Sequence, residues 1–271
     1  MTPPEHPTNL HRELAPVTPA AWAEIEEEAR RTFRRHVAAR RVVDVPDPAG
    51  PALAAVGTGH LSAVEPPAPG VTARLREARP LVELKVPFTV TRAAVDDVER
   101  GSRDSDWQPV KDAARTLALV EDRTVFDGYG AAGVEGLRAR TSHPVLPLPA
   151  EPRAYPDAVS RALSALRLAG VEGPYALLLG ADHYRAVAET SDHGHPVASH
   201  LDRMLDRPPV WAPALDGGVV LSTRGGDFEL RLGQDAAIGY TSHDADNVEL
   251  YLYETLTFLT YTDEAVVFLE P

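Results

Sequence analysis

Asp192, His193, His195 and His200 lie within nine positions of one another and form the densest group of chemically versatile side chains in the sequence. Imidazole and carboxylate groups are good ligands for zinc or iron, so this segment could hold a metal ion that activates water for hydrolysis. Its spacing matches no HExxH or comparable pattern, and a glycine and a proline interrupt it. The alternative is a solvated polar loop, because histidine titrates near neutral pH without being a ligand.

The segment GYGAAG at 128–133 fits the glycine pattern of dinucleotide-binding loops. That function needs a strand before the glycines and a helix after them, so that the pyrophosphate meets a helix N-terminus. Here the glycines follow a predicted helix, which favours a simple turn. The sequence also contains no G-x-S-x-G nucleophile motif, no phosphate-binding P-loop and no cysteine. We therefore predict no catalytic residues, no cofactor and no resident metal.

The composition of the chain argues against two classes of binding partner, nucleic acids and membranes. The net charge of −13 argues against general binding to nucleic acid, whose phosphates require a basic face. No apolar run approaches the roughly 20 residues that span a bilayer, and the first 14 residues lack the apolar core of a secretion signal. We expect a cytoplasmic protein that binds neither nucleic acid nor membrane.

The charges are unevenly distributed along the chain. Residues 30–41 contain six arginines and no acid, whereas residues 226–271 contain ten acids against Arg231 alone. The basic and acidic segments could attract each other within one subunit or between subunits, or they could be two separately solvated faces.

A helix is predicted from Pro19 to about Arg41, after an N-cap at Thr18 and a proline-rich arm over residues 1–18. The apolar residues of this segment recur at spacings of three and four, which places them on one stripe of the helix. They are Trp22, Ile25, Ala29, Phe33 and Val37.

Residues 44–80 change character, with seven prolines and four glycines in 37 positions and no strong periodicity. So long a stretch without secondary structure is unusual inside a compact domain. It is either disordered or an excursion whose backbone partners lie on another chain. The segment 82–90 that follows alternates as a strand does, and a short helix is predicted from the Thr91 cap to Gly101.

The rest of the chain combines helices and strands. Helices are predicted at 105–127, 159–169 and 182–189, and strands at 175–179, 219–222, 228–232 and 248–261. This order indicates an α+β fold in which a central α/β insertion interrupts a strand-rich scaffold.

Several ordered blocks of this sequence resemble the encapsulins, which are bacterial and archaeal shell proteins related to the major capsid proteins of tailed phages. The blocks span nearly the whole chain in the family's order. They include NLHRELAPVTPAAWAEIEEEAR, LVELKVPFTV, VEDRTVFDG, GVEGPYALLLGADHY, RGGDFELRLGQDAAIGY and LYLYETLTFLTYTDEAVV.

The resemblance implies the Hong Kong 97-like capsid fold and a function as a shell subunit that is not an enzyme. It assigns residues 1–43 to an N-terminal arm and inner-wall helix, and 44–80 to an extended loop that reaches a neighbouring subunit. Residues 81–130 and 225–271 become a peripheral domain, and 131–224 an axial domain. Copies of the chain are expected to form a closed icosahedral compartment in the bacterial cytoplasm.

Two sites follow from the resemblance. The five-fold pore of the shell is expected to be lined by Ser191, Asp192, His193, Gly194 and His195. Repeated around the axis, these residues would form rings whose charge changes with pH. Relatives often have tyrosine where this chain has His195, and the loop could instead only close the pentamer.

The second implied site binds the short apolar C-terminal peptide of a cargo enzyme, typically a dye-decolourising peroxidase or a ferritin-like protein. By position the candidates are Phe33, Arg34 and Val37 on the helix, with Asp235 and Ile238 opposite. Phe33 and Val37 also continue the apolar stripe of the helix, so packing is the alternative. Two other functions stay open: a prophage major capsid protein, and a metal-dependent hydrolase that uses residues 192–200.

Overall fold

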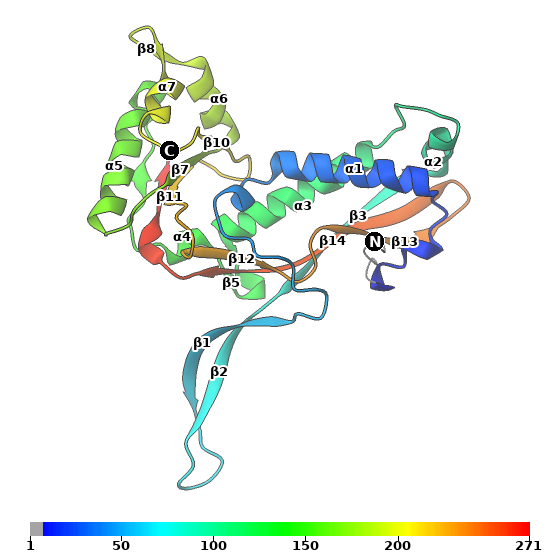
Figure 1. Cartoon of the computed structure of the whole chain (residues 1–271), viewed down its shortest axis with the longest axis horizontal. Helices are drawn as coiled ribbons and strands as arrows, with labels where there is room; N and C mark the ends of the chain where they lie inside the picture. The colour runs from blue at the N-terminus through cyan, green and yellow to red at the C-terminus, as the bar shows by residue number, and fades with distance from the viewer. Residues whose placement is uncertain (1–7) are drawn as a thin grey trace.

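The computed structural model describes residues 8–271, so the first seven residues of the predicted arm lie outside the described part (Figure 1). The fold combines helices with two main sheets and has two buried cores. This confirms the predicted α+β class. The first core is formed within residues 21–37, 88–118 and 238–252, and the second contains residues of both sheets.

Two long helices, α1 (Pro19–His36) and α3 (Gln108–Phe126), lie side by side over the first core (Figure 1). Helix α1 begins as predicted, because the Thr18 hydroxyl accepts the amide of Ala21 at 3.2 Å. The residues that it buries recur every four positions, which gives the stripe expected of a helix packed on one face. They are Ala21, Ile25, Ala29 and Phe33.

The predicted end of α1 near Arg41 is wrong, since the helix ends at His36. The Asp122 carboxylate accepts the backbone amides of Ala38 and Ala39 at 2.9–3.0 Å. These bonds replace helical hydrogen bonds and turn the chain into a short 3-10 turn at Ala39–Arg41. The short helix α2 (Arg92–Glu99) follows the Thr91 cap as predicted.

The first sheet is organised by the long strand β14 (Asn247–Thr260). Strand β3 (Val82–Thr91) pairs with it along one edge, while β13 (Ala237–His243) and β12 (Phe228–Leu232) pair with it along the other. The alternation expected of β14 is present over residues 247–252, whereas residues 252–259 are buried on both faces. Its buried face carries Val248, Leu250, Leu252, Leu256 and Phe258.

The second sheet has five strands in the order β10–β7–β11–β15–β6. Their bounds are Val210–Trp211, Tyr175–Leu179, Gly218–Ser222, Val266–Glu270 and Leu146–Pro147. The chain also forms helices α4 (Leu137–Arg140), α5 (Tyr155–Leu168), α6 (Ala181–Glu189) and α7 (Val197–Asp202), and α5 packs on β11 and β15. The last strand, β15, lies in a sequence range assigned to the peripheral domain, yet it pairs with β11 of this second sheet.

Strands β1 (Ala55–Val64) and β2 (Ala73–Pro80) form an antiparallel ribbon that projects from the rest of the molecule (Figure 1). The expectation that this stretch would find its backbone partners on another chain is wrong, because the two strands pair with each other. The alternation here is weak because neither face of the ribbon is buried by its own subunit.

The glycine segment 128–133 follows helix α3 and starts a small pair of strands, β4 (Gly128–Tyr129) and β5 (Val134–Glu135). A Cβ atom on Gly128 would lie 2.7 Å from the amide nitrogen of Gly136, so these glycines allow two backbone segments to cross closely. This confirms the turn and removes the geometry that dinucleotide binding requires.

Candidate functional site

An elongated groove of about 940 Å³ runs between helix α1 and strand β13. It brings together all five residues that the sequence predicts for peptide binding, although they come from segments about 200 positions apart. These are Phe33, Arg34, Val37, Asp235 and Ile238.

Apolar side chains line both walls of this groove, and charged ones line its rim. Phe33, Val37 and Ile238 are at least nine-tenths buried, so they pack into the core and offer only an edge to the groove. Ala237 is half-buried, and Arg34 is exposed at the rim. The groove can therefore take an extended apolar segment, with a guanidinium at its edge to meet polar atoms.

The groove has a charged floor that the sequence did not predict. Arg40 Nε and Nη2 donate to the two carboxylate oxygens of Glu121 at 2.8 and 2.6 Å. Its Nη2 also donates to Glu254 at 2.5 Å, and its Nη1 donates to Asp235 at 2.9 Å. The arginine also lies over the Phe33 ring, 4.8 Å from its centre. One cation thus connects α3, β14 and the segment just before β13 beneath the groove.

Burial governs the protonation of this cluster. The side chain of Glu254 is completely buried, and burial together with the charge of Glu121 raises its pKa well above the ordinary value. One of its oxygens has no hydrogen-bond partner within residues 8–271. Burial also raises the pKa of Asp122 to about 7, although the amides of Ala38 and Ala39 oppose this shift. Burial alone would lower the pKa of Arg40, but the hydrogen bond to Glu121 and the charges of the acidic groups around it, Glu121 first, together raise that pKa.

The polar segment at 191–196 is a small hairpin made of β8 (Ser191–Asp192) and β9 (His195–Pro196). Its two turn residues have positive φ, 46° at His193 and 82° at Gly194, as a tight hairpin of this kind requires. The His193 side chain is 93% exposed and lies 3.8 Å from the Asp192 carboxylate. The rings of His195 and His200 meet edge to face, with their centres 6.2 Å apart.

A hydrolytic metal site is not formed by this segment. Across residues 8–271, no three histidine, aspartate or glutamate side chains are grouped so that they could hold a metal ion. The hairpin instead points its tip away from the second sheet, at the end of the molecule (Figure 1).

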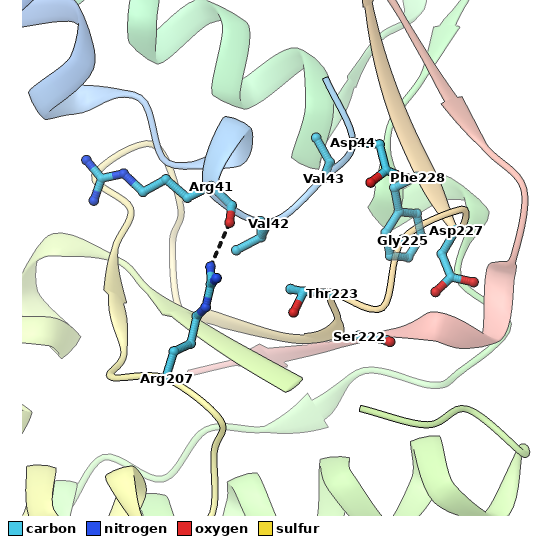
Figure 2. Close-up of a pocket in the computed structure, with 10 residues that line it drawn as sticks. All are labelled: Arg41, Val42, Val43, Asp44, Arg207, Ser222, Thr223, Gly225, Asp227 and Phe228. Carbon is cyan, nitrogen blue, oxygen red and sulfur yellow. Dashed lines mark hydrogen bonds between the residues drawn. The ribbon is translucent and has the colours of Figure 1, made fainter. Parts of the chain in front are cut away.

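A small cleft of about 120 Å³ lies where residues 41–44 meet the loop between β11 and β12 (Figure 2). Arg207 Nη1 donates to the backbone oxygen of Arg41 at 2.7 Å, and the amide of Gly226 donates to the Asp44 carboxylate at 2.6 Å. These bonds anchor the segment that leads to the ribbon, and the sequence did not predict them.

None of the helices in the described range is both long and apolar enough to cross a membrane.

The sequence of this chain is similar to those of known proteins over nearly its whole length. Residues 7–257 match the family model described as an encapsulating protein for peroxidase. The type 1 encapsulin shell protein of Mycobacterium tuberculosis is 64% identical over 96% of this chain and 98% of its own length. That of Rhodococcus erythropolis is 62% identical, with the same coverage of both chains.

The fold of this chain is also similar to the folds of solved structures. A virus-like particle from Pyrococcus furiosus matches with a TM-score of 0.64 at 14% identity, covering 90% of this chain and 97% of that one. The capsid of the myovirus XM1 matches with a TM-score of 0.54 at 10% identity, covering 83% of this chain and 88% of that one. At these identities the likeness concerns the fold, which is that of the tailed-phage capsid proteins.

Proposed function

Because this chain belongs to the family of type 1 encapsulin shell proteins, we propose that its copies assemble into a closed icosahedral shell that encloses an enzyme and admits small solutes. The chain is a structural shell component and not an enzyme. The compartment that it forms is proposed to lie in the bacterial cytoplasm.

The groove between α1 and β13 is the proposed docking site for the cargo enzyme, and we call it the cargo groove. Its apolar walls suit an extended peptide with one or two apolar side chains, and burying each of them contributes about 1.5–3 kcal/mol. Arg34 at the rim can hydrogen-bond the peptide backbone or its terminal carboxylate. The observation that carries this proposal is that Phe33, Arg34, Val37, Asp235 and Ile238 all line one groove.

The proposed cargo is a dye-decolourising peroxidase, with a ferritin-like protein as the second candidate. The description of the matching family as encapsulating a peroxidase supports the first. A compartment of this content would serve in oxidative stress or iron handling.

The hairpin at 191–195 is the proposed lining of a five-fold pore. Its support is the exposed tip at His193 and the carboxylate of Asp192 beside it. Repeated around an axis, such carboxylates would favour cations over anions.

The following experiment tests the docking proposal. The chain is co-expressed with a dye-decolourising peroxidase that carries an apolar C-terminal peptide, and with the same peroxidase lacking that peptide. Particles are isolated by sedimentation, and haem absorbance per particle is measured. We expect haem in the particles only when the peptide is present. Particles that contain equal haem with both forms would overturn the role of the peptide, and ferritin-like cargo is tested in the same way.

A further inference from the structure

A second groove, of about 510 Å³, lies between helices α1 and α3, which run side by side (Figure 1). On α1 the residues that line it fall on one side of the buried stripe, and those that line the cargo groove fall on the other. The cations that line this second groove come from both helices. They are Arg31 and Arg35 on α1, and Lys111 and Arg115 on α3. We call it the basic groove.

Three of these four cations have no partner within the described chain. Arg31 is paired with Glu28 at 2.5 Å, and Asp112 is bound by the Gln108 amide at 2.9 Å. No hydrogen bond or ion pair with any residue of 8–271 engages the side chains of Arg35, Lys111 or Arg115. The basic groove therefore carries a net positive charge that the subunit itself does not neutralise.

The four cations of the basic groove form two like-charged pairs along their helices. Arg31 and Arg35 are four positions apart on α1, and Lys111 and Arg115 are four positions apart on α3. Like charges at this spacing lie on the same helix face and destabilise the helix. Two such pairs line one groove, and the two carboxylates that line it with them, Glu28 and Asp112, leave it with more positive than negative side chains.

One end of the basic groove has a fixed aromatic lining. His36 Nδ1 donates to the backbone oxygen of Thr32 at 2.8 Å, which fixes the orientation of the ring. The Trp211 ring lies against it with the ring centres 5.6 Å apart, and both side chains are half-buried. At this end of the basic groove a ligand can therefore make an apolar contact next to the cations.

We propose that the basic groove binds an acidic segment of the enclosed protein, separate from the apolar peptide in the cargo groove. This inference rests on the proposed function, because it assumes that cargo reaches α1. The two grooves flank one helix, whose diameter of about 10 Å is spanned by about three extended residues. A cargo chain held in the cargo groove therefore brings its neighbouring residues within reach of the basic groove.

The groove suits a protein segment better than a nucleic acid. Its α1 wall runs from Glu28 to His36, which is about 13 Å of helix and too short for a long phosphate track. The carboxylates of Glu28 and Asp112 lie among the cations, and the chain as a whole carries a net charge of −13. Both features oppose a long polyanion, whereas a few glutamate or aspartate side chains can pair with Arg35, Lys111 and Arg115.

The test uses a small fluorescent reporter protein co-expressed with the full-length chain. One reporter carries a C-terminal tail of eight glutamates, and the other carries eight glutamines. Reporter molecules per particle are counted by fluorescence after sedimentation, and the absorbance ratio at 260 and 280 nm measures nucleic acid. The comparison includes the groove variant Arg35→Gln/Lys111→Gln/Arg115→Gln. Its control, Arg92→Gln/Arg103→Gln/Arg161→Gln, removes three exposed arginines elsewhere.

We expect at least threefold more glutamate-tailed than glutamine-tailed reporter in wild-type particles, and this excess should persist in the control. It should disappear in the groove variant. Equal capture of both tails in intact particles would overturn the proposal, and so would an excess that survives in the groove variant. Particles that are rich in nucleic acid and capture both reporters equally would also overturn the proposal, and would indicate that the basic groove binds nucleic acid. A failure to form particles, or to capture an apolar-tailed peroxidase, would instead count against the proposed function.

Discussion

The guanidinium of Arg40 forms a two-point hydrogen bond with the carboxylate of Glu121, with distances of 2.8 and 2.6 Å. The glutamate is completely buried and comes from a helix 81 positions further along the chain. The same guanidinium reaches Glu254, so one cation contacts two buried acidic side chains beneath the cargo groove.

Replacing Arg40 by alanine should strongly destabilise the subunit. Removing one partner of a buried ion pair leaves an uncompensated charge, which costs about 3–5 kcal/mol. In a chain of this size each kcal/mol corresponds to about 2–4 °C in the unfolding temperature. Scanning calorimetry of R40A should show a fall of roughly 6–20 °C, or no folded protein. The matched control is R100Q, which breaks an exposed pair with Asp97 and should cost less than about 1 kcal/mol. Equal small losses in both variants would contradict the role of the cluster.

Replacing Glu254 by glutamine should flatten the pH dependence of stability. The raised pKa means that folded Glu254 keeps its proton at pH values where the unfolded chain has lost it, above its ordinary value of 4.5. The folded state then binds more protons, so the free energy of unfolding falls as pH rises through this window. The glutamine side chain of the variant does not titrate, so this contribution disappears.

Unfolding temperatures of the wild type and E254Q are compared from pH 5 to pH 9. We expect the difference between them to shift in favour of E254Q as pH rises. Asp122, whose pKa is about 7, contributes a fall in stability that both proteins share. Parallel curves would show that Glu254 is ionised in the folded state.

A charge placed in the cargo groove should reduce cargo loading without affecting the shell. Ala237 is half-buried on the groove wall, so A237E would force an apolar peptide to lie against a carboxylate. Losing the burial of one apolar side chain, about 1.5–3 kcal/mol, weakens the binding of the peptide at least tenfold and so lowers the amount of cargo enclosed. Haem per particle measures it. A93E adds the same charge on exposed Ala93 of α2 and should load normally.

Removing the carboxylate of the hairpin should change which solutes pass into the shell. D192N would abolish a ring of negative charge at the proposed pore, so cationic dyes should lose their advantage over anionic dyes several-fold. The measurement is the ratio of oxidation rates of the two dyes by an enclosed peroxidase, normalised to the same enzyme outside the shell. D104N, in the exposed turn before α3, is the control. An unchanged ratio in D192N would assign permeation to another route.

The ribbon should be needed for assembly but not for folding. Leu75 and Val64 are 59% and 43% exposed, and the strand register places them on the same face of the ribbon. Exposed apolar groups that gather on one face are typical of an interaction surface. V64N/L75Q should therefore give soluble, folded subunits with few particles, as seen by circular dichroism and sedimentation. L168Q, at an isolated leucine that is 90% exposed, should still assemble.

The main elements were predictable because their signals are local. The alternation of 82–90 and 248–261 and the apolar run at 175–179 each reflect the burial of one strand, and the Thr18 and Thr91 caps fixed two helix starts. Strands β13 and β15 were missed, since a glycine with polar neighbours weakens the pattern of the first and the second is short. The ribbon was missed because its own subunit buries neither face.

The five residues that the resemblance implies for cargo binding line one groove, whereas its charged floor was not foreseen. Glu254 lies on the apolar face of β14, where an alternating pattern predicts an apolar residue. Its partner Arg40 is 214 positions away, so no local spacing connects them. The early end of α1 has the same kind of cause, since it depends on the side chain of Asp122 from α3.

The central claim is that copies of this chain form a closed shell, and the mass of the protein expressed alone tests it most directly. Light scattering coupled to size-exclusion chromatography, with negative-stain electron microscopy of the same fraction, gives mass and shape together. We predict hollow, uniform particles with a mass many times the 29.3 kDa of one chain. A stable monomer or dimer of the intact chain would contradict the claim.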